Sequence, residues 1–369
     1  MTLNTKLGIV AGSLVIATGV IWGAIWWASN QEAITLTNPE IVNRVTPEVN
    51  TNTAEVISDL VARRIDGMLI SADQANLWPI AVMIENAAFG GVRPQSGLSA
   101  AQVVYELPVE GGITRFLAVF AGDMPEKIGP VRSARPTYLE FSSEYNALYA
   151  HAGGSPEALA AVDGLAILDL SALAADSIYF YRDNNLVAPH NLFTSQELLN
   201  DARHDKGLDL ETPDYEAWDF KDDEPTANPS SEPLIYDFGS GPLYSVQYTY
   251  HAETNSYDRQ DGGDDHLDAN TGKVISPKVV IAQMIPAGTP AGTDGRVNFD
   301  VTGTGTAYIA QDGEVIEGVW SKTDRASRTV FRDAEGNRIE FNRGSIWISL
   351  IPATGSVSLP SALPNETTN

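Results

Sequence analysis

The sequence predicts a mixed α/β or α+β protein: an N-terminal transmembrane helix, an α/β domain, and a mainly antiparallel β domain. Residues 7–28 are apolar and carry no charge. Short apolar runs are interspersed with helical patterns over residues 78–210, which is typical of strands packed with helices. Over residues 234–352 polar and apolar residues alternate between glycine-containing turns, which is typical of antiparallel strands.

Composition narrows the classes of function. A chain of 369 residues allows about two to three domains at roughly 100–200 residues each. The net charge of −25 argues against nucleic acid as a partner, because two polyanions repel. The absence of cysteine excludes disulfides, thiolate metal sites, a cysteine nucleophile and a lipidated cysteine. With only five histidines we expect no metal site, and we expect no cofactor.

The predicted anchor occupies residues 1–29. A helix over residues 7–28 is about 33 Å long at ~1.5 Å per residue, close to the thickness of a bilayer core. The alternative is a cleaved signal peptide, but the run exceeds the usual apolar core of one and no small-residue cleavage motif follows cleanly. Lys6 precedes the run, so the positive-inside tendency places the N-terminus in the cytoplasm. We therefore expect a single-pass protein of the cell membrane with most of the chain extracytoplasmic.

A stalk with a short helix is expected over residues 30–77. Residues 30–52 are rich in Asn, Thr, Pro and Glu, which is typical of extended, exposed chain. From Thr53 onward, helical spacing places a set of apolar residues on one face: Val56, Leu60, Val61 and Ile65.

The α/β domain is expected over residues 78–210. Apolar runs predict strands at residues 78–85, 103–109 and 113–122. Helices are expected at residues 138–150 and 155–163, the second opened by Ser155 followed by a proline and a glutamate.

Three further segments complete the chain. Residues 211–233 are acidic and contain prolines, which predicts a linker between separately folding domains. In the β-rich domain over residues 234–352, Asp312-Gly313 and residues 335–337 separate alternating segments and predict hairpin turns. Residues 353–369 contain Pro, Ser, Thr and Gly and predict a disordered tail.

Arginines are the main candidate binding residues. Those within residues 78–200 lie in segments rich in Gly, Pro and Ser, and they are Arg93, Arg115, Arg132, Arg135 and Arg182. A guanidinium is a planar fork of donors that suits phosphate or carboxylate, so in this acidic chain the pattern predicts a convergent anion pocket. The alternative is that each arginine pairs with an acid such as Glu106 or Glu110 and fixes a loop.

Two histidines are candidate catalytic residues. His151 precedes Gly153-Gly154 at a helix start, and His190 lies in a Pro-His-Asn segment; the alternative is that both bond to the backbone and serve structure. No nucleophile motif is present. The complete ligand-binding set is Arg93, Glu110, Arg115, Arg132, Ser133, Arg135, His151, Arg182, His190 and Asn191.

An acidic segment of the second domain surrounds a Gly-Gly pair. It contains Asp258, Asp261, Asp264, Asp265 and Asp268 together with His266. The spacing does not match an EF-hand calcium loop, so we expect a solvated acidic hairpin.

Several motifs follow one another in a specific order over residues 78–352: PIAVMIENAAFGGVRPQSGL, HAGGSPEAL, APHNLF, YDRQDGG and NRGSIWISLIP. In these motifs the chain resembles the YerB-like family of bacterial lipoproteins. The resemblance implies a two-domain extracytoplasmic protein held at the membrane, with no assigned reaction. Lipoproteins of the family carry an anchoring cysteine, and because this chain has none, the apolar helix is expected to replace it.

The first domain also resembles, more weakly, the LytR-CpsA-Psr transferases, which move glycopolymers from polyprenyl pyrophosphate to the cell wall. The segments ITRF, VRSARPTY, HAGGSPEAL and YFYR follow that family's order. The resemblance implies that Arg132 or Arg135, together with Arg182, contacts pyrophosphate. The acid that helps hold a metal in that family is absent where Arg115 and Pro136 stand, and its later arginine motif is replaced by PHNLFTSQEL.

These observations favour a non-catalytic envelope protein anchored in the membrane through residues 7–28. It would bind an anionic cell-wall ligand, or a protein of cell-wall synthesis, through its arginines. One alternative is an enzyme that handles phosphoryl groups or glycopolymers with His151 and His190. The other is a structural scaffold.

Overall fold

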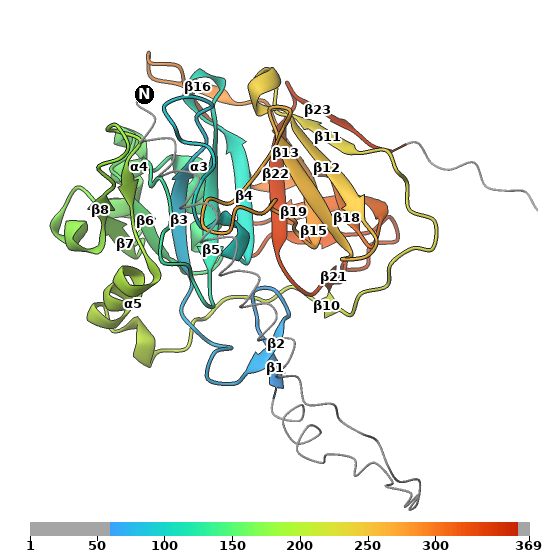
Figure 1. Cartoon of the computed structure of the whole chain (residues 1–369), viewed down its shortest axis with the longest axis horizontal. Coiled ribbons are helices and arrows are strands. Elements are labelled where there is room, and N and C mark those ends of the chain that lie inside the picture. Colours follow the sequence, from blue (N-terminus) through green and yellow to red (C-terminus); the bar gives the residue numbers. More distant parts are fainter. Residues whose placement is uncertain (1–59, 361–369) are drawn as a thin grey trace, which may run out of the picture. The chain divides into compact units, whose positions relative to one another are not determined.

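The structure is a computed structural model that describes residues 60–360 (Figure 1). The predicted anchor over residues 7–28 and the stalk over residues 30–52 lie outside the described residues. Among residues 60–360 no helix is long and apolar enough to cross a membrane. Residues 60–210 are called the first region below, and residues 234–360 the second region.

A ten-stranded mixed sheet runs through both regions. Its strands in spatial order are β20 (Val330–Arg332), β19 (Glu314–Lys322), β18 (Gly303–Gln311), β15 (Val279–Ile285), β22 (Ile346–Pro352), β4 (Val103–Pro108), β5 (Thr114–Phe120), β3 (Ile80–Glu85), β6 (Leu148–His151) and β7 (Asp169–Ser171). The strands predicted at residues 78–85, 103–109 and 113–122 are confirmed as β3, β4 and β5. All three are buried along their whole length, which explains why they read as continuous apolar runs.

Strand β22 joins the two regions. It pairs in parallel with β15 of the second region and with β4 of the first. The second region is therefore less purely antiparallel than predicted, because β22 inserts between β15 and β4, which are distant in sequence, and pairs with both in parallel.

Helices cover both faces of this sheet. They are α3 (Pro136–Ser143), α4 (Pro156–Gly164) and α5 (Gln196–Asp205), with the 3₁₀ turns η1 (Leu98–Ala100), η2 (Glu110–Gly112), η3 (Ala175–Tyr179), η4 (Leu208–Leu210) and η5 (Pro242–Tyr244). Helix α4 begins as predicted, since the Ser155 hydroxyl accepts a hydrogen bond from the Ala158 amide at 3.2 Å. The helix expected over residues 138–150 ends at Ser143 instead, and its second half is the turn and strand β6. Asn146, with φ of 49°, reverses the chain there.

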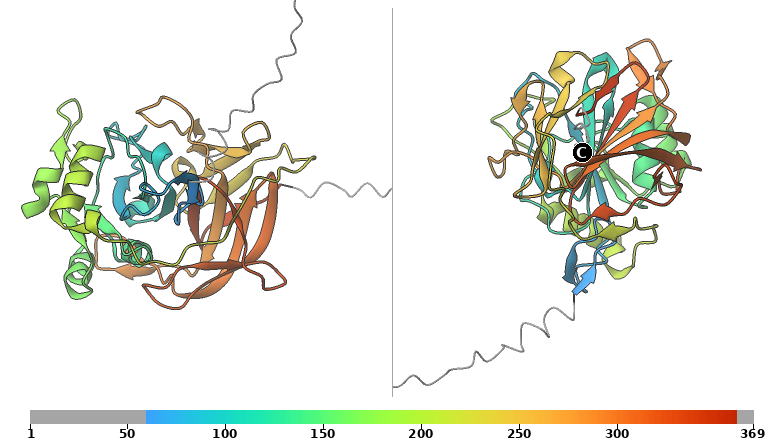
Figure 2. Two further views of the ribbon diagram at one scale, coloured as in Figure 1. Left: turned by 90° about the horizontal axis from the view of Figure 1, so that it is seen from below. Right: turned by 90° about the vertical axis from the view of Figure 1, so that its right-hand side faces the viewer.

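A five-stranded sheet packs on the second half of the large one (Figures 1 and 2). Its strands in order are β14 (Asp264–Asp265), β13 (Ser256–Asp261), β12 (Val246–His251), β11 (Leu234–Asp237) and β23 (Ser356–Ser358). Tyr236 and Tyr248 of this sheet lie in one core with Val280 and Trp347 of the large sheet. The disordered tail predicted over residues 353–369 is thus wrong for its first part, because β23 pairs with the edge of β11; residues 361–369 lie outside the described part of the chain.

Four short pairs of strands complete the fold. They are β1 (Leu60–Ala62) with β2 (Leu69–Ser71), β8 (Tyr181–Arg182) with β9 (Leu192–Phe193), β10 (Phe220–Lys221) with β21 (Phe341–Asn342), and β16 (Thr289–Ala291) with β17 (Arg296–Asn298). The short helix predicted from Thr53 is wrong where the chain is described, since residues 60–62 form a hairpin with β2. The helical spacing of apolar residues did not mark one buried face here, because Ile65 is buried but Leu60 and Val61 are exposed.

The segment predicted as a free acidic linker is anchored at its start. Tyr215 and Trp218 are buried, and the Trp218 indole donates to the carbonyl of Thr329 at 2.8 Å. Strand β10 then pairs with β21 of the second region. Most of residues 222–233 are exposed, so only this later part resembles the predicted linker.

The turns predicted in the second region are confirmed. Asp312 and Gly313 link β18 to β19 with φ of 57° and 78°, the left-handed conformation that a two-residue hairpin turn requires. Residues 335–337 close a second turn, which the bridge between Arg332 and Arg338 completes.

Candidate functional site

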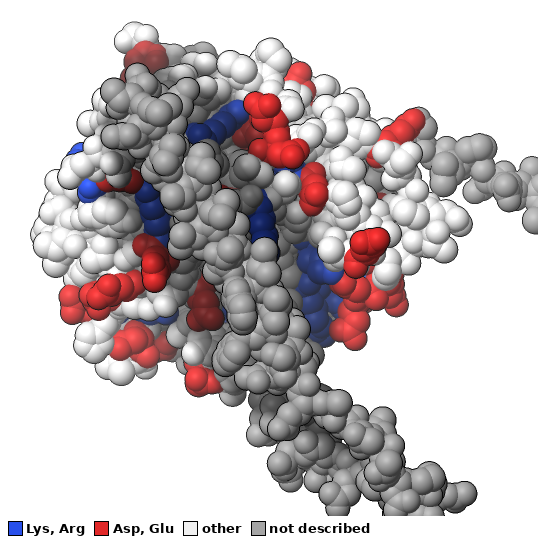
Figure 3. All heavy atoms as spheres, in the orientation of Figure 1, with Lys and Arg blue, Asp and Glu red and all other residues white. Residues whose placement is uncertain are grey.

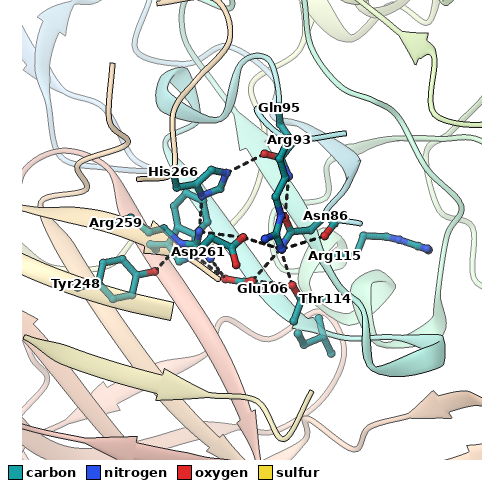
Figure 4. Close-up of polar contacts among 12 residues, drawn as sticks. Asn86, Arg93, Gln95, Glu106, Thr114, Arg115, Tyr248, Arg259, Asp261 and His266 are labelled. Carbon is teal, nitrogen blue, oxygen red and sulfur yellow. Dashed lines mark hydrogen bonds and ion pairs between the residues drawn. The ribbon is translucent and has the colours of Figure 1, made fainter. Parts of the chain in front are cut away.

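Polar residues at the ends of β3 and β5 are divided between two neighbouring clusters. Successive side chains of a strand point to opposite faces. Glu85 and Arg115, which are register partners, face the first cluster, whereas Asn86 and Thr114 face the second. The first is the arginine cluster: Glu85, Glu110, Arg115, Arg132, Arg135 and His190. The second is the inter-region network: Asn86, Arg93, Gln95, Glu106, Thr114, Arg259, Asp261 and His266 (Figure 4).

In the arginine cluster, Glu110 holds two guanidinium groups. Arg115 lies 3.3 Å from one carboxylate oxygen, and Arg135 donates to both oxygens, its Nε at 2.8 Å. Arg115 also donates to the carbonyl of Ser133 at 2.7 Å. Although burial opposes it, the hydrogen bond from Arg135 and the charges of both arginines lower the pKa of Glu110 to about 2. Burial, together with the charge of Arg135, lowers the pKa of Arg115.

Arg132 is held differently. Its Nε lies 3.1 Å from a carboxylate oxygen of Glu85, whose other oxygen accepts from His190 Nδ1 at 2.9 Å. The two terminal amino groups of Arg132 make no hydrogen bond to residues 60–360, and its side chain is 23% exposed. Of the clustered arginines, Arg132 is therefore the one whose amino groups remain available to a ligand.

His151 serves structure in this arrangement. The side chain is buried, with Nδ1 2.6 Å from the carbonyl of Gly153 and Nε2 2.7 Å from a carboxylate oxygen of Asp169. Both ring nitrogens are occupied by these partners, which link β6 to β7 and the glycine turn. The geometry therefore gives no support to the predicted acid–base role of His151.

The remaining predicted residues fall in three places. Arg182 donates to the Asn191 side chain at 2.7 Å and fixes the loop between β8 and β9, without a hydrogen bond to the arginine cluster. Ser133 contributes its carbonyl to Arg115 and donates its hydroxyl to the carbonyl of Ala152 at 2.9 Å. Arg93 belongs to the inter-region network. The structure thus brings together only part of the predicted set: Arg115, Arg132, Arg135, Glu110 and His190.

The inter-region network is built around Arg259, whose side chain is fully buried. Arg259 donates to Glu106 at 2.6 Å and lies 3.4 Å from Asp261 Oδ2. Asn86 donates to the same oxygen of Asp261 at 3.0 Å and to the Thr114 hydroxyl at 2.7 Å. Residues of both regions therefore share one buried set of charges (Figure 4).

Arg93 links the regions at the edge of this network. It donates to Asn86 Oδ1 at 2.9 Å and to the Leu243 carbonyl at 3.0 Å, and it lies 3.1 Å from Asp261 Oδ2. Its guanidinium carbon is 5.1 Å from the centre of the Tyr244 ring. Arg93 was predicted to bind an anion, but its guanidinium donors are thus engaged by groups within the protein.

Protonation in the network follows from its hydrogen bonds. The amide of Gln95 donates to the Glu85 carbonyl, so its oxygen accepts from His266 Nε2 at 2.8 Å. His266 Nδ1 is then the acceptor that faces Arg259. Burial and the charge of Arg259 lower the pKa of His266 well below 6.5, which keeps the ring neutral. Burial raises the pKa of Glu106, although the charge of Arg259 opposes this.

The acidic hairpin predicted in the second region is only partly solvated. Asp264 and Asp265 are exposed, but Asp261 and Asp268 are buried. Asp268 accepts from the amides of Gly97 at 3.0 Å and Ser99 at 2.8 Å. Donors of the first region thus take the place of water at Asp268 and at one oxygen of Asp261.

Sequence reasoning missed most of the network: Asn86, Gln95, Thr114, Arg259, and the pairing of Glu106 with Arg259 across the two regions. One signal was present, since Glu106 is a charged residue within an otherwise apolar strand. Such a residue is buried only with a partner. The partner lies 153 positions away and could not be identified from spacing.

Two family models match the chain: "Protein of unknown function (DUF3048) N-terminal domain" over residues 67–209 and the corresponding C-terminal domain over residues 237–348. The protein named "Putative lipoprotein YerB" from Bacillus subtilis (strain 168) is 31% identical over 283 residues, which are 76% of this chain and 83% of the relative. The chain belongs to the YerB-like family. The crystal structure of the Bacillus subtilis YerB protein matches with a TM-score of 0.71 at 30% identity, over 80% of this chain and 99% of that one.

The YerB-like resemblance predicted from the motifs is therefore confirmed. In this YerB-like chain the two matched regions meet along β4 and β22 and through the inter-region network. Within residues 60–360 no group of three or more His, Asp or Glu side chains is arranged to hold a metal ion.

Proposed function

We propose that this YerB-like chain is an envelope protein, held at the membrane with most of its length outside, that binds an anionic ligand through Arg132. The observation that carries the proposal is the pair of Arg132 amino groups, which lack a partner among the described residues. Guanidinium N–H groups bind phosphate and carboxylate oxygens through short, charge-assisted hydrogen bonds. The apolar run over residues 7–28 would supply the anchor in a chain without cysteine.

Local charge supports an anion at this place. Arg115, Arg132 and Arg135 carry three positive charges against the two carboxylates of Glu85 and Glu110. The cluster thus keeps positive charge in a chain whose net charge is −25. On the face drawn in Figure 3, by contrast, Lys and Arg lie close to Asp and Glu. An anion bound to Arg132 would reduce the repulsion between the arginines.

Pyrophosphate binding tests the proposal. The full chain in detergent is titrated with inorganic pyrophosphate while its melting temperature is followed, with potassium chloride at equal ionic strength as the salt control. We expect pyrophosphate to raise the melting temperature. Arg132→Gln should weaken pyrophosphate binding at least about tenfold, because hydrogen bonds to charged groups contribute roughly 1.5–3 kcal/mol.

A matched variant separates a site from general charge. Arg332→Gln removes one positive charge from the exposed end of strand β20 in the second region. It should leave pyrophosphate binding unchanged. Equal losses in Arg132→Gln and Arg332→Gln, or no response of the wild type, would refute a site at Arg132.

A further inference from the structure

A separate pocket of about 320 Å³ opens between the two regions, beside the inter-region network. Ligand pockets span about 300–1,000 Å³ and occur preferentially between structural units, so this one has room for a small molecule. Arg93, Asp261, Asp264, Asp265 and His266 line it together with apolar side chains that include Leu243. None of these residues belongs to the arginine cluster.

Negative charge dominates this pocket. Its lining has three aspartates and one cation, Arg93, whose donors are engaged by Asn86, Asp261 and the Leu243 carbonyl. Arg259 also pairs with Asp261, from outside the lining, at 3.4 Å. His266 adds no charge, since its Nδ1 accepts from Arg259. The Asp264 side chain makes no hydrogen bond or ion pair with residues 60–360, and the Asp265 side chain accepts from Gln260 at 3.0 Å. The lining is therefore suited to a cation.

Asp261 supplies the independent evidence. Its side chain is 1% exposed, and its Oδ2 is surrounded by Asn86, Arg93 and Arg259. Its Oδ1 is buried and has no hydrogen-bond partner within the described chain. A buried acceptor without a donor costs free energy, so a ligand N–H that reaches Oδ1 would be stabilised there.

Two glycines allow the turn beside the pocket to pack closely against neighbouring residues. Gly262 and Gly263 have φ of 67° and 92°. A Cβ atom at Gly262 would lie 2.8 Å from the Leu243 carbonyl oxygen and 3.2 Å from Arg93 NH1. Glycine therefore lets the turn pack on Arg93 while it presents Asp264 and Asp265 at the pocket.

We propose that this pocket binds a small aliphatic ammonium cation. The ammonium group donates to Asp261 Oδ1 and is neutralised by Asp264 and Asp265, while the hydrocarbon part packs on Leu243 and the neighbouring apolar side chains. The pocket does not include Arg132, so this proposal does not depend on the proposal of an anion site at Arg132.

Calorimetric titration of the full chain in detergent with 1,4-diaminobutane tests the site. We expect saturable binding of one equivalent. The diol 1,4-butanediol, which has the same carbon chain without charge, should not bind. Magnesium chloride at equal charge concentration should neither reproduce nor abolish the diamine signal. Equal responses to the diamine and to magnesium would identify general counterion attraction and overturn the proposal, as would binding of the diol.

Paired variants locate the site. Asp264→Asn with Asp265→Asn should weaken diamine binding about tenfold, because each exposed ion pair contributes a few-fold at most. Glu253→Gln with Glu335→Gln removes the same charge from two exposed positions elsewhere and should leave affinity unchanged. Asp261→Asn should also lose affinity, but it alters the buried network, so the exposed pair decides the test. Equal effects of the two double variants would overturn the proposal, whereas Arg132→Gln should not alter diamine binding.

Discussion

Glu110 shows how one side chain fixes the chemistry of its neighbours. It accepts from Arg135 and pairs with Arg115, which leaves Arg132 with unpaired amino groups beside them. The sequence indicated that these arginines lie near one another, since they occupy turn-like segments around two adjacent strands. The sequence could not indicate which carboxylate pairs with each arginine, because Glu85 and Glu110 are both close to the arginines in sequence. Only the conformation of the turn after β4 determines the pairing.

Replacement of Glu110 should destabilise the protein in a pH-dependent way. The carboxyl has a pKa of 4.5 when unfolded and about 2 when folded, so it contributes stability above pH 4.5 that is lost as the pH falls towards 2. Glu110→Gln should therefore be less stable than wild type at pH 7, and the two should converge below pH 4.5. Urea denaturation at several pH values measures this; a constant difference down to pH 2 would contradict the ionic role of Glu110.

At the scale of elements, periodicity predicted the buried strands and the capped helix α4 correctly. Periodicity failed to predict the element where an apolar run was compatible with both a helix and a strand. Residues 148–151 continue the apolar pattern of α3 but form β6, because pairing with β3 and β7 decides their state. Hairpins were predictable since their turn residues carry a local signal, as at Asp312-Gly313.

Two turn glycines give a matched pair of substitutions. Gly313 and Gly336 have φ of 78° and 88°, so alanine is strained at both. A Cβ at Gly313 would lie 2.6 Å from the Tyr250 ring, whereas one at Gly336 would meet nothing within 4 Å. Gly313→Ala should therefore lower the free energy of unfolding by about 1 kcal/mol more than Gly336→Ala, in the range of overpacking costs. Equal losses in chemical denaturation would show that the ring moves aside without cost.

At the scale of the whole described molecule, the predicted division into separately folding units does not match the hydrogen bonding. One sheet crosses the boundary, and the Glu106–Arg259 pair is buried between the regions. Sequence could predict two regions, since strand patterns change between them. It could not predict their joining, because a parallel pair such as β4 and β22 leaves no local pattern to mark its partner.

Limited proteolysis tests this continuity. Residues 225–233 form the largely exposed second half of the segment between the regions. Cleavage there should be early, and the two products should elute together in size-exclusion chromatography under native conditions, because β4 and β22 still pair. Denaturant should separate them. Products that part without denaturant would show that the shared sheet contributes little to stability.

The position of β22 has a consequence for the order in which the chain can fold. Trp347 lies beside Glu106, 241 residues later in the sequence. Strand β4 therefore keeps an open edge until β22 has been synthesised, and contacts so distant in sequence form slowly. A nascent or truncated chain that lacks β22 exposes two strand edges, at β4 and at β15, to any neighbouring strand.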